Sequence, residues 1–193
     1  MVSALVLATR NPHKLREFTR LLAPAGIAVE GLPEHVVLPP EDGDSFQANA
    51  LPKARAAASA LGRAAIADDS GIEAAALGGR PGVRSARFAG EGASDEQNLA
   101  RLIELVEPGS ALRYVCALAY VDPRGGVETV QFGECRGTMS AHRRGEHGFG
   151  YDPVFVADAA DGRTMAELSD EEKDAISHRG DAVRRLLRWL ERE

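Results

Sequence analysis

Residues 64–81, AAIADDSGIEAAALGGRP, connect two apolar runs through two adjacent carboxylates followed by Ser-Gly. The first apolar run, residues 64–67, predicts a buried strand that ends in Asp68 and Asp69, and open α/β sheets bind ligands at the carboxyl ends of their strands. Since adjacent strand residues point to opposite faces, the two carboxylates are expected to have different roles. The alternative is an Asp-Ser-Gly turn, because all three residue types are common in turns.

The composition predicts one soluble globular domain that spans residues 1–193. Of these, 44% are hydrophobic and 27% are charged, which is enough apolar material for a full core. The net charge of −6 argues against a nucleic-acid partner, and no apolar run approaches the ~20 residues of a membrane span. No basic segment precedes the apolar N-terminal residues, so we expect a cytoplasmic protein without a signal peptide. Cys116 and Cys135 are then expected to be free thiols, with a disulfide across a hairpin as the alternative.

An expected strand-to-helix turn near the N-terminus has the features of an anion site. Residues 2–8 predict a buried strand, and Asn11 followed by Pro12 predicts the N-cap and first residue of a helix. The turn brings Thr9, Asn11 and Lys14 near the N–H groups of the first helical turn, where backbone donors and the helix dipole favour an anion. The alternative is simple capping of the helix, with Lys14 on a solvated face.

The remaining elements alternate between strands and helices, which favours a mixed sheet with helices on its faces. Two strands flank the turn Asp-Pro-Arg-Gly-Gly and predict a β-hairpin, and two Ser-Asp-Glu-Gln/Glu sequences predict capping boxes. We expect helices at residues 12–22, 45–61, 94–106 and 183–190, strands at residues 27–32, 112–121 and 127–133, and a short strand or an irregular segment at residues 83–88.

Three further stretches carry side chains suited to a ligand. Loop residues 41–44, Glu-Asp-Gly-Asp, offer metal ligands or, alternatively, only add to solubility. Loop residues 148–153, GFGYDP, place two aromatic rings among glycines, where a ring can stack on a flat base or instead fill the core. His178 and Arg179 lie at an expected helix junction, where their donors can point into a cleft or form a surface pair.

Together, these parts favour the binding of a nucleoside triphosphate with a divalent cation. Mg²⁺ typically binds one or two protein carboxylates together with phosphate oxygens and water, and Glu41 and Asp69 fit that number. This interpretation needs a cation because carboxylates that face a triphosphate would repel it. The chain has no GxxxxGK[ST] motif and no GxSxG motif, which excludes a P-loop NTPase and a nucleophile elbow.

Five motifs in this order resemble the inosine triphosphate pyrophosphatase family, from about Leu5 to Leu190. The resemblance implies an elongated mixed α/β sheet in two lobes with a central cleft, and a homodimer. It also implies Mg²⁺-dependent hydrolysis of ITP, dITP or XTP to the monophosphate and pyrophosphate, which keeps these nucleotides out of DNA and RNA precursor pools. The motifs are Thr9-x-Asn11-x-x-Lys14, Glu41-x-Gly43-x-Ser45-Phe46 with Asn49-Ala50, Asp68-Asp69-Ser70-Gly71, Phe149-Gly150-Tyr151-Asp152-Pro153 and Ser177-His178-Arg179.

The resemblance also assigns a role to each motif. Residues 9–14 and Lys173 would hold the phosphates. Glu41 and Asp69 would bind the metal, and Asp69 would also accept a proton from the attacking water. Ser70 would lie against the substrate. The 149–152 loop would pack on the base, and His178 with Arg179 would recognise its 6-oxo edge. The substrate-binding set is Thr9, Arg10, Asn11, His13, Lys14, Ser70, Phe149, Gly150, Tyr151, Asp152, Lys173, His178 and Arg179.

The chain departs from the family pattern at Gln47 and Ala48, where acidic residues are usual, which leaves the number of metal ions open. Two other classes of protein stay open as alternatives. A phosphatase of the haloacid-dehalogenase type would use Asp68 or Asp69 as its nucleophile, although no Asp-x-Asp pair stands near the N-terminus. A catalytically silent nucleotide-binding module is the second alternative, and the presence of both Glu41 and Asp69 argues against it.

Overall fold

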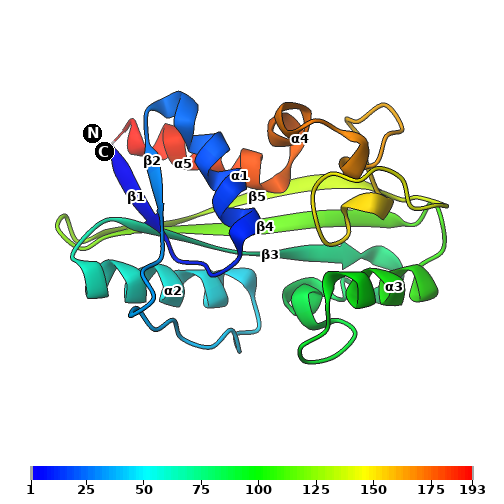
Figure 1. Cartoon of the computed structure of the whole chain (residues 1–193), viewed down its shortest axis with the longest axis horizontal. Coiled ribbons are helices and arrows are strands. Elements are labelled where there is room, and N and C mark those ends of the chain that lie inside the picture. The colour runs from blue at the N-terminus through cyan, green and yellow to red at the C-terminus, as the bar shows by residue number, and fades with distance from the viewer. Residues whose placement is uncertain (1, 193) are drawn as a thin grey trace. The chain divides into compact units, whose positions relative to one another are not determined.

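The computed structural model describes residues 2–192, whose six strands form one sheet in the order β2-β1-β3-β4-β5-β6 (Figure 1). β1 pairs in parallel with β2 and β3, whereas β6 pairs antiparallel with β5. The sheet is therefore mixed, and the predicted mixed α/β fold is confirmed. The strands are β1 Ala4–Leu7, β2 Ala28–Gly31, β3 Ala65–Ala74, β4 Ala111–Asp122, β5 Val127–Met139 and β6 Phe155–Ala157.

The helices begin where the sequence places N-cap residues. Asn11 accepts hydrogen bonds from the N–H groups of the first turn of α1, and Ser45 caps α2 in the same way. Ser94 and Ser169 each form a complete capping box, as predicted. The helices are α1 Pro12–Leu22, α2 Phe46–Leu61, α3 Asp95–Leu105, α4 Asp170–Ile176 and α5 His178–Leu190, and short 3₁₀ turns form η1 Ala23–Ala25, η2 Ala75–Leu77, η3 Gly82–Arg87, η4 Asp152–Val154 and η5 Met165–Glu167.

The chain divides into two compact units, each assembled from separate segments. Unit 1 comprises the chain up to Asp69, then Cys116–Gly133 and the residues from Arg179 onward. Unit 2 comprises Ser70–Val115 and Glu134–His178. The chain therefore changes units between Asp69 and Ser70, and again between His178 and Arg179, so the candidate site residues belong to both units.

In unit 1, α1 and α5 cover one face of the strands and α2 covers the other (Figure 1). The first face is packed by buried side chains such as Leu7 of β1, Phe18 of α1 and Leu186 of α5. Four alanines of α2 are fully buried, which lets the α2 backbone lie close to the strands. These packed layers hold the loops at the carboxyl end of β1 in place.

The core of unit 2 forms around the other halves of β3, β4 and β5. Buried side chains from these strands, including Ile72 and Met139, pack with Leu102 of α3 and with Phe155 and Met165 from the segment after β5. Beyond this core, α3 and α4 lie on opposite sides of the strands in Figure 1. The loop at residues 149–152 is anchored in this unit.

Some sequence-based expectations were wrong in detail. β3 continues through Asp68 and Asp69 to Ala74 because its other neighbour in the sheet, β4, extends beyond the point where β1 stops. Residues 83–88 form no strand, since η3 occupies most of them. The short strand β6 was not predicted.

Cys116 and Cys135 are buried free thiols, as expected, and burial raises the pKa of both. Within residues 2–192, no helix combines the length and apolar character needed to cross a membrane.

Candidate functional site

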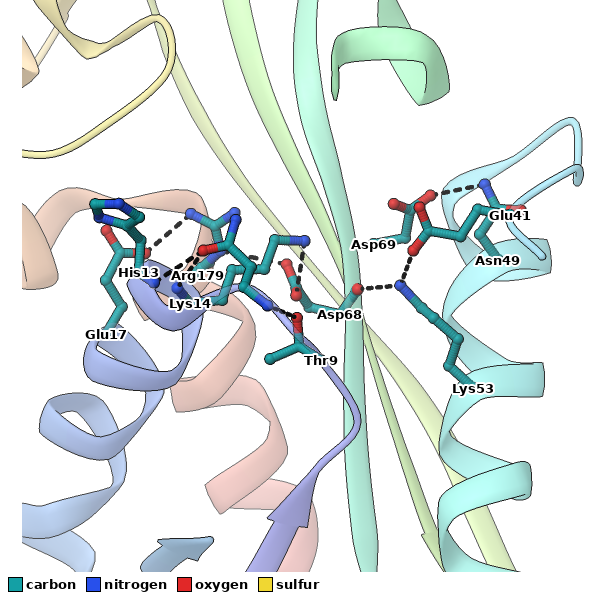
Figure 2. Close-up of polar contacts among 11 residues, drawn as sticks. Thr9, His13, Lys14, Glu17, Glu41, Asn49, Lys53, Asp68, Asp69 and Arg179 are labelled. Carbon is teal, nitrogen blue, oxygen red and sulfur yellow. Dashed lines mark hydrogen bonds and ion pairs between the residues drawn. The ribbon is translucent and has the colours of Figure 1, made fainter. Parts of the chain in front are cut away.

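Asp68 and Asp69 lie on β3 just beyond the end of β1. The last residue of β1, Leu7, pairs with Ile66, so both carboxylates stand beside the turn that follows β1. Their side chains point to opposite sides of β3 and have different partners (Figure 2). The different roles predicted from strand alternation therefore have a structural basis.

Asp68 is a fully buried carboxylate that pairs with two cations. Its Oδ1 lies 3.0 Å from Nζ of Lys14, and its Oδ2 accepts a hydrogen bond of 3.2 Å from Nε of Arg179. Nη1 of Arg179 also donates to Oε2 of Glu17, a buried acid on α1, at 2.9 Å. Burial by itself raises the pKa of Asp68, but the charges of Lys14, Arg179 and Lys53 outweigh it and hold the pKa well below its ordinary value.

Asp69 has a different environment. Its Oδ2 accepts a 2.9 Å hydrogen bond from Nδ2 of Asn49, which lies on α2. Oδ1 of Asn49 accepts from the backbone N–H of Gly43 at 2.8 Å, and a Cβ at Gly43 would lie only 2.7 Å from that oxygen. Loss of solvent on burial raises the pKa of Asp69, and the bond from Asn49 and the nearby lysines only partly oppose this shift. Asn49 thus connects Asp69 to the loop that carries Glu41.

Lys53 links the two sides of the strand. Its buried Nζ donates to the backbone oxygen of Asp68 at 2.8 Å and also contacts Oε1 of Glu41 (Figure 2). Lys53 and Glu17 belong to none of the five motifs, and Asn49 belongs to one but was given no role at the site. The signal that could have identified them is a polar residue on the apolar face of a predicted helix, because a buried polar group requires a partner.

The turn after β1 is capped more completely than the sequence suggested. Oγ1 of Thr9 accepts from the N–H of Asn11 at 3.2 Å, and Oδ1 of Asn11 accepts from the N–H groups of His13 and Lys14 at 2.8 and 3.3 Å. Two backbone N–H groups of the first helical turn are thus engaged by the cap, as in the capping alternative, and anion binding at this turn stays a prediction. Lys14, however, is directed to Asp68 instead of lying on a solvated face. His13 contacts Arg16 through its ring.

Arg10 ties the turn after β1 to the loop after β2. Its Nη1 donates to the carbonyl oxygen of Leu32 at 2.8 Å. Its Nη2 lies within hydrogen-bond distance of the carbonyl oxygens of Pro33, Glu34 and Val36, at 3.0, 3.1 and 2.9 Å. The family resemblance places Arg10 among phosphate-binding residues, whereas these contacts give it a structural task. The loop that it fastens continues to Glu41.

Arg10→Ala is expected to loosen residues 32–36 because these carbonyl groups lose a shared donor. A single hydrogen bond stabilises by about 0.5–1.5 kcal/mol, so amide hydrogen exchange at Val36 should accelerate by about tenfold or more. Hydrogen exchange measured by NMR or mass spectrometry checks this. The matched control is Arg185→Ala, which removes an exposed arginine paired with Asp181 on its own helix. Unchanged exchange at Val36 in Arg10→Ala would contradict the structural task.

In unit 2, the carboxylate of Asp152 organises a second cluster. Its Oδ2 accepts hydrogen bonds from the backbone N–H of Phe149 at 2.9 Å and from Nζ of Lys173 at 2.7 Å. The same Nζ lies 5.2 Å from the centroid of the Phe149 ring. Gly148 is required here, because it has a φ of +74° and a Cβ would approach Oδ2 of Asp152 to 2.1 Å. This cluster holds the 149–152 loop against α4.

The two aromatic residues of this loop have different positions. Tyr151 is a core residue, 6% exposed, and its hydroxyl donates to the carbonyl oxygen of Ser85 at 2.7 Å. Phe149 is half-buried beside Lys173. The alternative in which an aromatic ring fills the core therefore holds for Tyr151, whereas Phe149 keeps part of its surface exposed. Gly150 and Ser70 are also half-buried.

His178 and Arg179 lie at the predicted helix junction, where Ser177 ends α4 and α5 begins. Both side chains are buried, which excludes the alternative of a surface pair. The His178 ring stacks on Tyr114, with centroids 4.7 Å apart and planes at 10°. Arg179 instead joins the Asp68 and Glu17 carboxylates of unit 1, and these carboxylates raise the pKa of its guanidinium although burial alone would lower it.

Asp69 and the neighbouring Glu41 offer carboxylate ligands of the kind that Mg²⁺ binds. Among the described residues, no group of three or more His, Cys, Asp or Glu side chains could hold an ion by itself. Glu41 and Asp69 are two hard carboxylate donors, and the charge on Glu41 contributes to the raised pKa of Asp69. This donor set fits Mg²⁺, which binds few protein carboxylates and takes its remaining ligands from phosphate and water.

In open α/β sheets, ligands bind beyond the carboxyl ends of the strands, and this is where Asp68 and Asp69 lie beside Lys14 and Lys53. The chain belongs to the Ham1 family, which it matches over residues 5–189. A dITP/XTP pyrophosphatase of Symbiobacterium thermophilum is 48% identical, covering 96% of this chain and 94% of the relative. The dITP/XTP pyrophosphatase of Bacillus subtilis is 42% identical over 96% of both chains.

A solved structure has the same fold over its whole length. The HAM1 protein from Coxiella burnetii superposes with a TM-score of 0.86, at 36% identity, and covers 100% of both chains. Together with the sequence relatives, this match confirms the family resemblance drawn from the five motifs.

Proposed function

We propose that this chain hydrolyses the α–β phosphoanhydride bond of non-standard purine nucleoside triphosphates, such as ITP, dITP and XTP, to the monophosphate and pyrophosphate. One observation carries the proposal: the half-buried Glu41 and the buried Lys53 and Asp69 form an acid–lysine cluster beyond the end of β1, in a chain that aligns over nearly its full length with dITP/XTP pyrophosphatases. Removing such nucleotides would keep them out of DNA and RNA precursors. Residues 1–193 would act as a single enzymatic domain.

Residues of the 9–14 turn, of β3 and of the loop before α2 would bind the phosphates and the metal. Glu41 and Asp69 would hold Mg²⁺, which when bound would neutralise the charge that develops on the phosphate oxygens. Lys14 would bind phosphate together with the other residues of the 9–14 turn. Asp69 would accept the proton of the attacking water, and its raised pKa suits that role because a base is more effective when its pKa approaches the working pH.

The 149–152 loop and the junction between α4 and α5 would contribute the contacts to the base. The loop formed by Phe149, Gly150, Tyr151 and Asp152 would pack on the base, with the ring of Phe149 against it and Tyr151 holding the loop from the core. Lys173 would reach a phosphate. His178 with Arg179 would donate hydrogen bonds to the 6-oxo edge, and Ser70 would lie against the substrate. A site built to donate to an oxygen leaves its donors unpaired against a 6-amino group, and such mismatches can be worth about 10⁴-fold. This would explain discrimination against ATP.

Analysis of the products from ITP and from ATP, with and without Mg²⁺, tests the proposal. IMP and pyrophosphate released from ITP, only with the metal and much faster than from ATP, is the expected result. Release of orthophosphate would instead favour a phosphatase of the haloacid-dehalogenase type. Nucleotide binding without turnover would favour a silent binding module.

We also propose that the protein acts in the cytoplasm as a homodimer. The two buried free thiols, Cys116 and Cys135, fit a reducing compartment, and the dimer is what the family resemblance implies. Light scattering coupled to size-exclusion chromatography distinguishes a mass near 41 kDa from the 20.5 kDa of one chain (2 × 20.5 = 41). A mass of 20.5 kDa at micromolar concentration would argue against the dimer.

A further inference from the structure

Tyr114 belongs to none of the five sequence motifs, yet it contacts two of the residues proposed for base recognition. It lies on β4 in unit 2 and is 6% exposed. Its hydroxyl donates to Oδ1 of Asp152 at 3.1 Å. Its ring lies nearly parallel to the imidazole of His178 and contacts Phe155 in a tilted arrangement, with centroids 4.5 Å apart.

The bond to Asp152 matters because this carboxylate holds the 149–152 loop. Oδ2 of Asp152 accepts from the N–H of Phe149 and from Lys173, so the rotation of the carboxylate sets the position of both. The Tyr114 hydroxyl binds the opposite oxygen and thereby restricts that rotation. Since Asp152 is buried, with 3% of its surface exposed, a lost donor could not readily be replaced by solvent.

The stacked ring acts on His178 in a different way. An imidazole pressed against a parallel aromatic ring keeps its plane, and hence the direction of its ring nitrogens, fixed. His178 is the first residue of α5, and several rotamers of its side chain are compatible with the backbone, so contacts with neighbouring side chains select among them. Tyr114 itself is held by a strand in the core of unit 2, so it is a rigid support.

We propose that Tyr114 is a positioning residue for base selectivity, whose hydroxyl fixes the Asp152 carboxylate and whose ring fixes the His178 imidazole. This inference rests on the proposed function, in which the 149–152 loop and His178 contact the base. Tyr114 touches no reacting atom, so its loss changes which base is accepted more than how fast a bound triphosphate is cleaved.

The test measures kcat/KM for ITP and for ATP in three variants and uses the ratio of the two values. Tyr114→Phe keeps the stacked ring and removes only the hydroxyl, and we expect the ratio of ITP over ATP to fall about two- to tenfold. Tyr114→Leu also removes the ring, and we expect a further fall, to about tenfold or more below the wild-type ratio. The control is Tyr120→Phe. Tyr120 is a buried tyrosine of the same strand that packs on Trp189 of unit 1, and we expect this variant to keep the wild-type ratio.

The ratio separates positioning from a purely structural role, because partial unfolding lowers both kcat/KM values by the same factor. If Tyr114→Leu fails to fold, Tyr114→Phe decides the question, since it retains the ring. An unchanged ratio in Tyr114→Phe and in folded Tyr114→Leu would overturn the inference and leave the proposed function intact. A wild-type enzyme that shows no preference for ITP, or that releases orthophosphate, would overturn the proposed function and the inference together.

Discussion

Asp69→Asn is expected to remove most of the turnover and to leave the fold at least as stable as that of the wild type. Asparagine cannot accept a proton from water, and loss of a general base typically lowers kcat by about 10²–10⁴-fold. The amide oxygen can still accept the hydrogen bond from Asn49. Because burial raises the pKa of Asp69, the fold disfavours its charge, and a neutral side chain of the same shape removes that cost.

Three measurements check this prediction: kcat for ITP, ITP binding by calorimetry and the melting temperature. Binding should persist, while kcat falls and the melting temperature stays equal or rises. Asp158→Asn, which neutralises an exposed aspartate of unit 2, is the control and should leave all three unchanged. Near-normal turnover of Asp69→Asn would remove Asp69 from the proposed mechanism. A lower melting temperature would contradict the direction of its pKa shift.

Much of the fold could be predicted because the signals are local. Asn11 before Pro12, and Ser94 in its capping box, mark helix starts that the structure places at the same residues. The alternation of side chains along a strand was enough to assign Asp68 and Asp69 to different faces. Each of these inferences needs only a few neighbouring residues, and tertiary contacts do not override them.

The partners of the buried charges could not be predicted, because they come from distant parts of the chain. Arg179 contacts Asp68 across 111 residues and Glu17 across 162. A pattern of 3.6 or 2 residues carries no information about such pairs. For the same reason the sequence offered only a ligand contact or a surface pair for Arg179. Tyr114 gave no signal at all, since a tyrosine in an apolar strand is an ordinary core residue.

Asp68→Asn is expected to destabilise the fold, although it is the same chemical change one residue away from Asp69. The substitution leaves Lys14 and Arg179 without the carboxylate that pairs with both of them in unit 1. Breaking a buried ion pair by removing one partner costs about 3–5 kcal/mol, because a buried charge is left uncompensated. Glu17 still faces Arg179, which favours the lower part of that range.

The lowered pKa of Asp68 predicts how the stability difference between Asp68→Asn and the wild type changes with pH. The pKa of Asp68 is lower in the folded state than in the unfolded state, where it is about 3.9. Its contribution is therefore fully present above about pH 4 and is lost as the pH falls below that value toward the folded pKa. The free energy of unfolding of Asp68→Asn should accordingly lie below that of the wild type at pH 7, and the difference should shrink in acid.

Urea denaturation of both proteins at pH 7 and at several values below pH 4 measures this difference. Asp181→Asn is the matched control, because its carboxylate pairs with Arg185 along the exposed side of α5, at 3.1 Å. Such a surface pair contributes about 0–1 kcal/mol, so the control should change little at any pH. If Asp68→Asn were as stable as this control at pH 7, the buried carboxylate would not be the counter-ion of Lys14 and Arg179. Opposite effects of asparagine at positions 68 and 69 would instead show that one strand carries a carboxylate for stability on one face and a carboxylate for chemistry on the other.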